Sequence, residues 1–454
     1  MIRRLITPLK ERIFILTALK DALSFLVVIP LVTVSGLYFT QKLRAVQFRT
    51  LPLSLRLMSP KSNGGSISSF GAIAAVLGGN LGTGNIAGIA VALSTGGPGA
   101  LFWMWIMAFL GAILKYVGSY LGVTYRETQA DGRVVGGPMY YLKNAVGRPK
   151  LATIYCLLLI AGALTTGNMV QVNSLSLPLT QAGYSPFIMG LVMAVLLGAT
   201  LLGGMTRFTH VVSCVVPFMA AGYLGTCIYI LWAHSAHIMP ALEIIVKSAF
   251  GLSPALGGAL GYSIFASVQA GFDRGLFATD AGLGLAAILH APVNTPSDRV
   301  PSNAIAQGIM SVLSPLIVMC VCMVTGLVLM TTNAWQMPGL ESTNLCMHAF
   351  CVGLSHDSAG MIVLVTLFFF AFTTVLTWSF CADRAVAFLF GEHRVRAFQI
   401  LFVALVPVGS IVSATDAWQL ADIFLGFMLL INVFALFVLR TDVIRETRAF
   451  LSKQ

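Results

Sequence analysis

A glycine-rich apolar stretch from Val76 to Ala100 constrains this chain more than any other part of its sequence. The stretch is long enough to cross a bilayer as one helix, but five glycines interrupt its first half, and Asn80, Thr83 and Asn85 lie among them. Each glycine costs roughly 1 kcal/mol against alanine in a helix interior. Close packing of small residues between helices gives a similar pattern. The interspersed polar residues instead favour a broken helix whose gap is buried and faces a small polar ligand.

The composition places the chain in a membrane. Hydrophobic residues make up 57% of the sequence and charged residues only 9%, a mixture that a soluble protein of this length could not cover with polar surface. The net charge of +11 would favour nucleic acid as a partner of a soluble protein, but here the basic residues cluster in loops. We therefore predict an all-α polytopic membrane protein of the cytoplasmic (inner) cell membrane, with the lipid bilayer and no nucleic acid as partner. The oligomeric state stays open.

Eleven apolar stretches of about 20 residues or more, the length that spans a bilayer, can be counted along the chain. They lie near residues 22-40, 69-94, 98-124, 151-178, 184-204, 207-233, 255-290, 303-331, 359-390, 396-415 and 417-440. Lys and Arg concentrate after the odd-numbered stretches, which predicts an outside N-terminus and an inside C-terminus. The basic N-terminal tail is the exception, and its alternation of apolar and basic residues predicts an interfacial helix over residues 1–20.

A second glycine-interrupted stretch lies in the seventh span, where Gly271, Gly275, Gly282 and Gly284 surround three charged residues. The two interrupted stretches each open a block of five spans, 2-6 and 7-11, and because five is odd the second block must insert upside down. This predicts an inverted five-plus-five repeat with two broken helices. The predicted units are an N-terminal segment with an extra span and a basic cytoplasmic loop, two repeats, and a cytoplasmic tail, at residues 1-62, 63-235, 236-440 and 441-454.

Single polar residues inside the spans each have two interpretations. Asp280 is a functional candidate because a charge at bilayer depth is costly, and the alternative is a structural ion pair or helix cap with Arg274. Thr373 and Thr374 either ligate a cation or bond back to the preceding turn. Lys115 is expected to snorkel toward the cytoplasmic interface.

The other reactive side chains form no recognisable catalytic set. Among the eight cysteines, Cys346 and Cys351 are candidates for a loop disulfide, and the rest are expected to be packing residues. His234 and His237 have a metal-chelating spacing but no third ligand nearby, so interfacial solvation is the favoured interpretation. The sequence shows no Walker loop and no Ser/His/Asp set. We therefore expect neither an enzyme nor an organic cofactor.

Seven motifs taken together resemble the alanine/glycine:cation symporter family, whose members share the leucine-transporter-like (LeuT-like) five-plus-five inverted-repeat fold. They are GTGNIAG (82–88), GGPGALFWMW (96–105), YRE (125–127), GGPMYYL (136–142), GNMVQVNS (167–174), RGLFATDAGLG (274–284) and FAFTTVLTW (370–378). The resemblance implies inward symport of alanine or glycine with sodium as coupling ion, by alternating access.

The resemblance also implies roles for particular residues. The first break and the fourth span would hold the substrate carboxylate, and the second break its ammonium, which gives a substrate set of Thr83, Gly84, Asn85, Gln171, Gly271, Phe272 and Gly275. The free N–H groups of a half-helix N-terminus suit a carboxylate, although Gln171 could instead hydrogen-bond between helices. Sodium would bind carbonyl and hydroxyl oxygens of Gly78, Leu81, Phe370, Thr373 and Thr374.

The chain departs from the usual family pattern at several positions. Thr279 and Asp280 stand where the family usually has Asn-Glu, Ser314 lies in a segment of span eight where an Asp is expected, and Ile431 replaces a Pro. These changes leave the coupling ion, its stoichiometry and the exact substrate open, including its chirality. The alternatives are a proton-coupled symporter of the same fold that uses Asp280, and a sensor that binds the amino acid without moving it.

Overall fold

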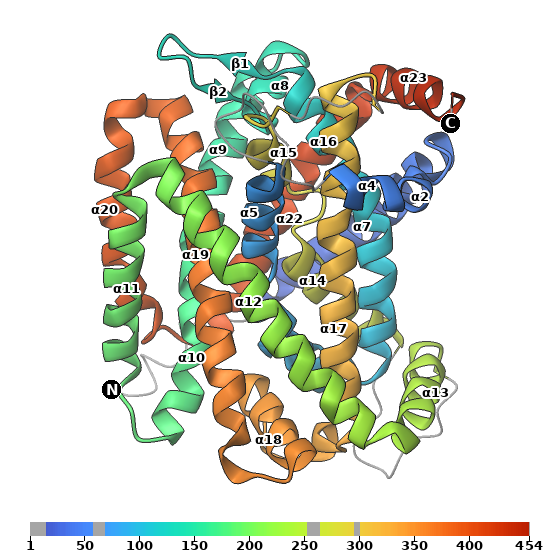
Figure 1. Cartoon of the computed structure of the whole chain (residues 1–454), viewed down its shortest axis with the longest axis vertical. Coiled ribbons are helices and arrows are strands. Elements are labelled where there is room, and N and C mark those ends of the chain that lie inside the picture. Colours follow the sequence, from blue (N-terminus) through green and yellow to red (C-terminus); the bar gives the residue numbers. More distant parts are fainter. Residues whose placement is uncertain (1–14, 58–68, 252–263, 295–299, 454) are drawn as a thin grey trace.

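Helices make up nearly all of the described residues, and the long ones run between two opposite ends of the molecule (Figure 1). The computed structural model of the chain describes residues 15–57, 69–251, 264–294 and 300–453. Seven helical stretches in these ranges are long and apolar enough to cross a membrane: Ile15–Lys42, Gly99–Thr124, Pro149–Gln181, Thr206–Ala233, Asn303–Thr331, Asp357–Phe390 and Ala414–Val438. The chain is therefore an all-helical polytopic membrane protein apart from a short hairpin.

The helices of the first half of the chain follow its apolar stretches. They are η1 (Ser24–Val28), α2 (Ile29–Lys42), α3 (Val46–Arg49), α4 (Leu51–Leu57), α5 (Ser69–Asn80), η2 (Thr83–Asn85), α6 (Ala87–Gly96), α7 (Gly99–Thr124), α8 (Pro138–Asn144), α9 (Pro149–Leu164), η3 (Thr165–Met169), α10 (Val170–Gln181), α11 (Pro186–Leu201) and α12 (Gly204–Ala233). A two-stranded antiparallel hairpin, β1 (Glu127–Thr128) with β2 (Val134–Val135), joins α7 to α8.

The second half of the chain is built in the same way. Its elements are η4 (Ser235–His237), α13 (Ile238–Ala249), α14 (Ile264–Thr279), α15 (Leu285–His290), α16 (Asn303–Ser311), α17 (Leu313–Thr331), η5 (Ala334–Gln336), α18 (Ser342–Leu354), η6 (Asp357–Ala359), α19 (Gly360–Phe390), η7 (Glu392–Arg394), α20 (Val395–Ala404), α21 (Val406–Gly409), α22 (Ala414–Val438) and α23 (Arg440–Leu451). Four predicted stretches correspond to shorter helices than the seven spans above: α5 with α6, α11, α14 with α15, and α20 with α21.

Two of these helical stretches are broken near the middle of the molecule. Between α5 and α6 the backbone of Gly82 is extended, with φ −109° and ψ −165°, and a single 3-10 turn follows. Between α14 and α15 the chain passes through left-handed conformations at Asp280, Gly282 and Gly284, with φ of 50°, 78° and 96°. Glycine adopts such angles without a Cβ clash, whereas an aspartate there is uncommon. The second break is therefore a local departure from helix geometry with a strained residue at its start.

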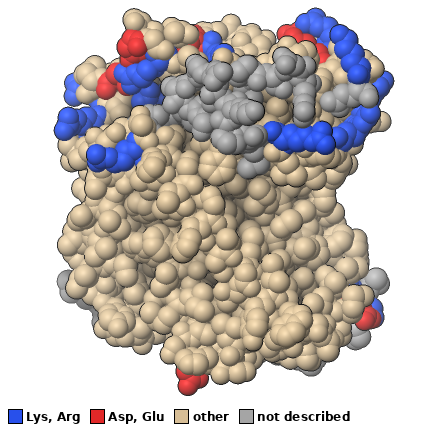
Figure 2. Space-filling view, in the orientation of Figure 1, with Lys and Arg blue, Asp and Glu red and all other residues tan. Residues whose placement is uncertain are grey.

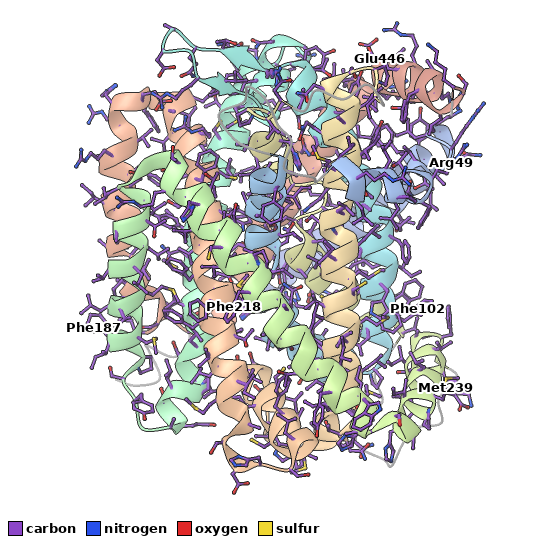
Figure 3. All side chains as sticks on the ribbon, in the orientation of Figure 1. Arg49, Phe102, Phe187, Phe218, Met239 and Glu446 are labelled. Carbon is purple, nitrogen blue, oxygen red and sulfur yellow. The ribbon has the colours of Figure 1, made fainter. Side chains whose placement is uncertain are left out.

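Charge is segregated along the long axis of the molecule. Lys and Arg gather at the end that carries the hairpin, α8 and α23, and the band below them is almost free of charge (Figure 2). Apolar side chains such as Phe187 and Phe218 project outward from this band, whereas Arg49 and Glu446 lie at the charged end (Figure 3). This pattern is typical of a protein whose middle faces lipid. The predicted basic residues of 1–14, Lys61 and Arg299, and the predicted helix start over 255–263, lie outside the described residues.

The predicted disulfide between Cys346 and Cys351 is not formed in this fold. Cys346 and Cys351 do not lie in a loop but on α18, and both are free thiols. Cys346 donates to the carbonyl of Ile86 at 3.4 Å, and Cys351 to that of Asp357 at 3.1 Å. Five residues of helix turn the two side chains away from each other, so the loop-disulfide prediction is wrong.

Candidate substrate and cation sites

The first break is held open by a side chain from within it. The Asn85 Nδ2 donates to the carbonyl oxygen of Asn80, the last residue of α5, at 2.5 Å, and to that of Gly82 at 3.3 Å. Its Oδ1 accepts from the Cys322 thiol of α17 at 3.1 Å. Asn85 is fully buried, so its side chain stabilises the break and is not free for a substrate.

Thr83 and Gln171 of the predicted substrate set lie in direct contact. The Gln171 Oε1 accepts hydrogen bonds from both the backbone N–H and the hydroxyl of Thr83, each at 3.1 Å. The Gln171 Nε2 donates to the carbonyl of Thr166 at 3.0 Å, within the π-helical turn η3. A π turn often marks a functional position because it exposes backbone groups and re-aims side chains. One amide oxygen thus accepts hydrogen bonds from two donors of the first break, the N–H and the hydroxyl of Thr83.

Four of the five residues in the predicted sodium set come together where α5 meets α19. The Thr374 hydroxyl donates to the carbonyl of Gly78 at 3.0 Å, across the two helices. The Thr373 hydroxyl donates to the carbonyl of Phe370 at 3.2 Å, the back-bonding that is common for threonine in membrane helices. Leu81 is also fully buried and lies just beyond the last residue of α5. We call the oxygens of Gly78, Phe370, Thr373 and Thr374 the α5–α19 oxygen cluster.

Gly82 joins this cluster to the substrate residues. A Cβ at Gly82 would lie 2.6 Å from the Thr374 Oγ1 and 3.0 Å from the Gln171 Oε1. Both distances are shorter than a carbon–oxygen van der Waals contact. Only glycine fits between the two groups, so the candidate cation and substrate positions share one backbone segment.

The second break lies further along the chain than the sequence predicted. Gly271, Phe272 and Gly275 belong to the regular helix α14, and the break begins at Asp280. Gly271 and Gly275 pack against α7: a Cβ at Gly275 would lie 3.1 Å from that of Met107. Carbonyls inside a regular helix already accept hydrogen bonds. The predicted position of the break is therefore wrong, because here the glycines serve close helix packing, whereas the assignment of the substrate ammonium to these three residues stays a prediction.

Phe277 covers the first break from the side of α14. A Cβ at Gly84 would lie 2.6 Å from the Phe277 ring, and this ring packs against Trp418 of α22 with centroids 4.5 Å apart. Trp418 also lies 3.8 Å from the Cβ position of Gly88. Two aromatic rings therefore form one wall of the first break, and their bulk limits the side chain that a ligand could carry there.

Arg274 pairs with a residue that the sequence did not single out. It forms a buried ion pair with Asp422 of α22, and its guanidinium lies 4.4 Å from the ring centroid of Trp418, within the range of a cation–π contact. Asp273 accepts instead from Ser24 of η1 at 2.5 Å. Of the two interpretations of Asp280, the ion pair or helix cap with Arg274 is not found, because Arg274 belongs to a network with α22.

Asp280 belongs to a separate buried polar cluster. The Asn80 Nδ2 donates to the Asp280 Oδ2 at 2.7 Å, while the Asn80 Oδ1 accepts from the Lys115 ammonium of α7. Lys115 also donates to the Ser314 hydroxyl of α17 at 3.1 Å. The prediction that Lys115 snorkels to an interface is wrong, because only 4% of the residue is exposed. We call Asn80, Lys115, Asp280 and Ser314 the Lys115 cluster.

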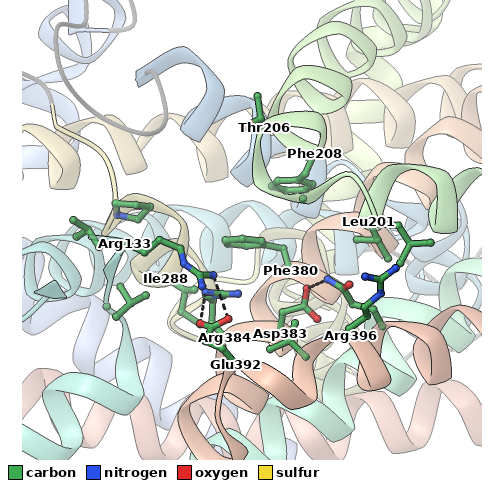
Figure 4. Close-up of a pocket in the computed structure, with 18 residues that line it drawn as sticks. Arg133, Leu201, Thr206, Phe208, Ile288, Phe380, Asp383, Arg384, Glu392 and Arg396 are labelled. Atoms are coloured by element: carbon green, nitrogen blue, oxygen red, sulfur yellow. Dashed lines mark hydrogen bonds and ion pairs between the residues drawn. The ribbon is translucent and has the colours of Figure 1, made fainter. Parts of the chain in front are cut away.

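A pocket lies at each end of this central region. The one away from the charged end has a volume of about 440 Å³ and is lined by α6, α14 and α22, including Arg274, Trp418 and Asp422. The other, of about 430 Å³, lies at the charged end among the hairpin, α12, α19 and α20 (Figure 4). The Phe277–Trp418 pair stands between the first pocket and Gly84.

Ion pairs cross the pocket at the charged end. Arg133 of the hairpin and Arg384 of α19 both pair with Glu392, at 3.2 and 3.1 Å, and Gln399 of α20 donates to Asp383 at 2.6 Å (Figure 4). These contacts tie the hairpin to the ends of α19 and α20.

The hairpin itself is fixed by Asp131. The backbone N–H of Arg133 donates to Asp131 at 3.0 Å and its guanidinium at 2.6 Å, and these hydrogen bonds lower the pKa of the Asp131 carboxyl below its usual value. The carboxylate therefore stays ionised and keeps the turn closed at neutral pH.

Helices α12 and α19 connect this pocket to the α5–α19 oxygen cluster. Phe208 and Phe380 stack in the pocket wall with centroids 5.2 Å apart. About two helical turns further along, Val216 and Thr373 lie 3.3 and 3.5 Å from the Cβ position of Gly78. Movement of either helix would therefore change the pocket and the oxygen cluster together.

Sequence reasoning missed several residues of this region. Phe277 and Trp418 carried no signal beyond being aromatic residues in apolar spans, and Ser314 was noted only as a departure from a family pattern. Asn80 was noted among the glycines, but its amide could not be assigned to two partners about 35 and 200 residues away. Contacts of this range depend on the packing of whole helices.

Two broken helices that meet at a buried polar centre, with a pocket toward each end, are the arrangement of a secondary transporter. The sequence model of the sodium:alanine symporter family matches residues 11–454 of the chain. The chain belongs to this family of multi-pass membrane transporters.

Three relatives show the range of the family. The chain is 35% identical to a sodium/alanine symporter of Methanococcus maripaludis, over 92% of each chain. It is 31% identical to a sodium/proton-dependent alanine carrier protein of a Bacillus species (strain PS3), over 84% of this chain and 87% of the relative. It is 29% identical to a probable sodium/glutamine symporter of Bacillus subtilis, over 89% and 83%.

Proposed function

We propose that this protein carries small neutral amino acids, alanine and glycine first, into the cell together with sodium by alternating access. The observation that carries the proposal is the contact between Thr83 and Gln171. One side-chain oxygen accepts from a backbone N–H and a hydroxyl at the first break, which is what a substrate carboxylate oxygen would do. Family membership supports the same substrate class.

The carboxylate replaces the Gln171 oxygen at Thr83 and extends toward Gly84. The broken end of α6 supplies a partial positive charge there. The Gln171 amide then turns to meet the substrate, and Phe277 with Trp418 limits its side chain. Asn85 contributes by keeping the break open. A small amino acid fits this wall best, while a larger one requires the two rings to move.

Sodium binds at the α5–α19 oxygen cluster. Sodium is a hard cation that prefers oxygen ligands, as calcium and magnesium do, and the Gly78 carbonyl with the Thr374 hydroxyl offers two that now bond to each other at 3.0 Å. When the ion binds, the Thr374 and Thr373 hydroxyls turn from their carbonyl acceptors toward it. Because Gly82 lies between Thr374 and Gln171 with no room for a Cβ, ordering of one site favours the other, as linkage between ion and substrate requires.

The architecture proposed for this cycle has eleven crossings. Residues 63-235 and 236-440 form the two inverted halves of a LeuT-like fold, and residues 1-62 add a further span. The charged end faces the cytoplasm, because short loops rich in Lys and Arg stay inside, which gives an outside N-terminus in the inner membrane. The Arg274 pocket then faces outward and the Glu392 pocket inward, and rocking of the helices opens them in turn.

Uptake of labelled alanine into proteoliposomes tests the proposal. An inward sodium gradient is compared with an inward proton gradient at equal membrane potential. Accumulation driven by sodium supports symport, and its loss in Thr373→Ala with Thr374→Ala, while Thr83→Val weakens alanine affinity alone, supports the two sites. Alanine that binds to the protein but never accumulates would instead indicate a sensor.

Proton-coupled symport by Asp280 is the second candidate. The Asp280 Oδ1 is buried with no hydrogen-bond partner among the described residues, and one relative is named as sodium/proton-dependent. Accumulation that follows the proton gradient without sodium, and that is lost in Asp280→Asn, would favour this function.

A further inference from the structure

The Lys115 cluster brings together polar groups from four helical segments that are distant in the sequence. Asn80 ends α5, Lys115 lies in the middle of α7, Asp280 begins the second break and Ser314 begins α17. All four residues are at least nine-tenths buried. A polar cluster this deep in a membrane protein costs free energy unless all its groups are satisfied, so a buried charge that is kept there is a candidate for a role in transport.

The cluster offers one cation a set of oxygen ligands. The Asn80 Oδ1 and the Ser314 Oγ both accept from the Lys115 ammonium, and the Asp280 carboxylate is linked to the same amide at 2.7 Å. The second carboxylate oxygen, Oδ1, is buried without a partner among the described residues. An amide oxygen and a hydroxyl are ligands that a hard metal cation takes in proteins, and the Asp280 carboxylate, which is bonded to the other end of the Asn80 amide, adds negative charge beside them.

We propose that the Lys115 ammonium is a tethered cation that fills a second cation position beside the first break. The protein then needs only one mobile sodium ion, at the α5–α19 oxygen cluster, for each amino acid. This inference rests on the proposed function and adds its stoichiometry. Lys115 is a positioning residue, because it acts through Asn80 and does not contact the proposed substrate residues.

The connections of Asn80 explain why a cation is needed at this position. Its side chain holds the second break through Asp280, and its backbone carbonyl accepts from Asn85 inside the first break. The Lys115 charge balances that of Asp280, so the centre of the protein stays neutral before the mobile ion binds. Without this charge, the buried carboxylate and the two neutral oxygens would attract another cation.

The test counts sodium ions per alanine. In proteoliposomes, the ratio of labelled sodium to labelled alanine is measured for the wild type, for Lys115→Met, which removes the charge at similar length, and for Lys115→Arg, which keeps it. We expect one sodium per alanine in the wild type and in Lys115→Arg, and two in Lys115→Met. The double variant Lys115→Met with Asp280→Asn should return to one.

A sodium titration of thermal stability separates a cation site from hydrogen bonds that serve only the structure. Lys115→Met should gain a steeper sodium-dependent rise in unfolding temperature than the wild type, because a second ion stabilises only the folded state. If the Lys115 hydrogen bonds serve only the structure, the variant should have a lower stability with an unchanged sodium dependence. An active Lys115→Met protein with one sodium per alanine overturns the inference.

If Lys115→Met is not recovered as a folded protein, the wild-type ratio and the double variant decide, and two sodium ions per alanine in the wild type overturn the inference. Sodium-driven alanine uptake with that wrong ratio refutes the tethered cation alone. Absence of any sodium-driven uptake by the wild type refutes the proposed function.

Discussion

Gly82→Ala should impair sodium and alanine binding together. The new methyl group would lie 2.6 Å from the Thr374 Oγ1 and 3.0 Å from the Gln171 Oε1, so both side chains must give way. The backbone angles of Gly82, φ −109° and ψ −165°, are open to alanine. The effect is therefore one of space, and it falls on a hydroxyl proposed for sodium and an amide proposed for the substrate.

The expected magnitude follows from the cost of overpacking. Inserting a methyl group into a well-packed interior costs about 1–3 kcal/mol. In the empty protein the Thr374 hydroxyl can rotate away, but with sodium bound it must keep its orientation, so most of the cost appears in the bound state. A loss of about 1–3 kcal/mol corresponds to roughly a 5- to 150-fold rise in half-saturating concentration.

The assay is alanine uptake into proteoliposomes at varied sodium and varied alanine. Gly118→Ala is the control, because Gly118 is likewise a buried glycine, here within helix α7, but a Cβ there meets no atom within 4 Å. We expect the control to keep wild-type values and Gly82→Ala to raise both half-saturation constants. A folded Gly82→Ala protein with both constants within a factor of two of wild type would refute the shared-segment reasoning.

Three further substitutions test separate contacts. Thr374→Val should raise the half-saturating sodium concentration by roughly 2- to 13-fold, the worth of one hydrogen bond of about 0.5–1.5 kcal/mol, whereas Thr374→Ser should restore it; equal sodium curves for the two variants would contradict the ion site. Gln171→Glu should weaken alanine uptake more than tenfold, because a fixed carboxylate would compete with that of the substrate at Thr83, and it should also lower thermal stability, because the carboxylate cannot donate to the Thr166 carbonyl; wild-type affinity in this variant would contradict the carboxylate assignment. Asp422→Asn should destabilise the protein by about 3–5 kcal/mol, because it leaves a buried Arg274 without its partner, and a melting curve identical to wild type would show that the pair carries little stability.

The sequence predicted the helical membrane class and the first break correctly, because these depend on local composition. Twenty apolar residues between basic loops have few alternatives in a bilayer. The glycines around Asn80, Thr83 and Asn85 also produced an irregular segment where expected. In such cases the local sequence determines the structure more than contacts with distant residues do.

The same reasoning failed where one residue type can have two structural roles and only the packing of distant helices decides between them. Glycine marks both helix breaks and close helix contacts, and at Gly271 and Gly275 the contact with α7 decides. A lysine in a span can reach an interface or a buried acceptor, and Lys115 finds Asn80 and Ser314 because α7 lies in the centre of the molecule. The partner of Arg274 lies 148 residues away, beyond any local pattern.

The Asn85 side chain lowers the entropy that the protein loses when a ligand binds. Since its amide donates to the carbonyls of Asn80 and Gly82 and its oxygen accepts from Cys322, the gap between α5 and α6 is held open by groups of the chain itself. An incoming amino acid does not have to unwind a helix, so little conformational entropy is lost on arrival. The binding enthalpy of alanine should then reflect mainly the exchange of one oxygen for another at Thr83. A small amino acid, which can make only a few contacts, can therefore still bind at this break.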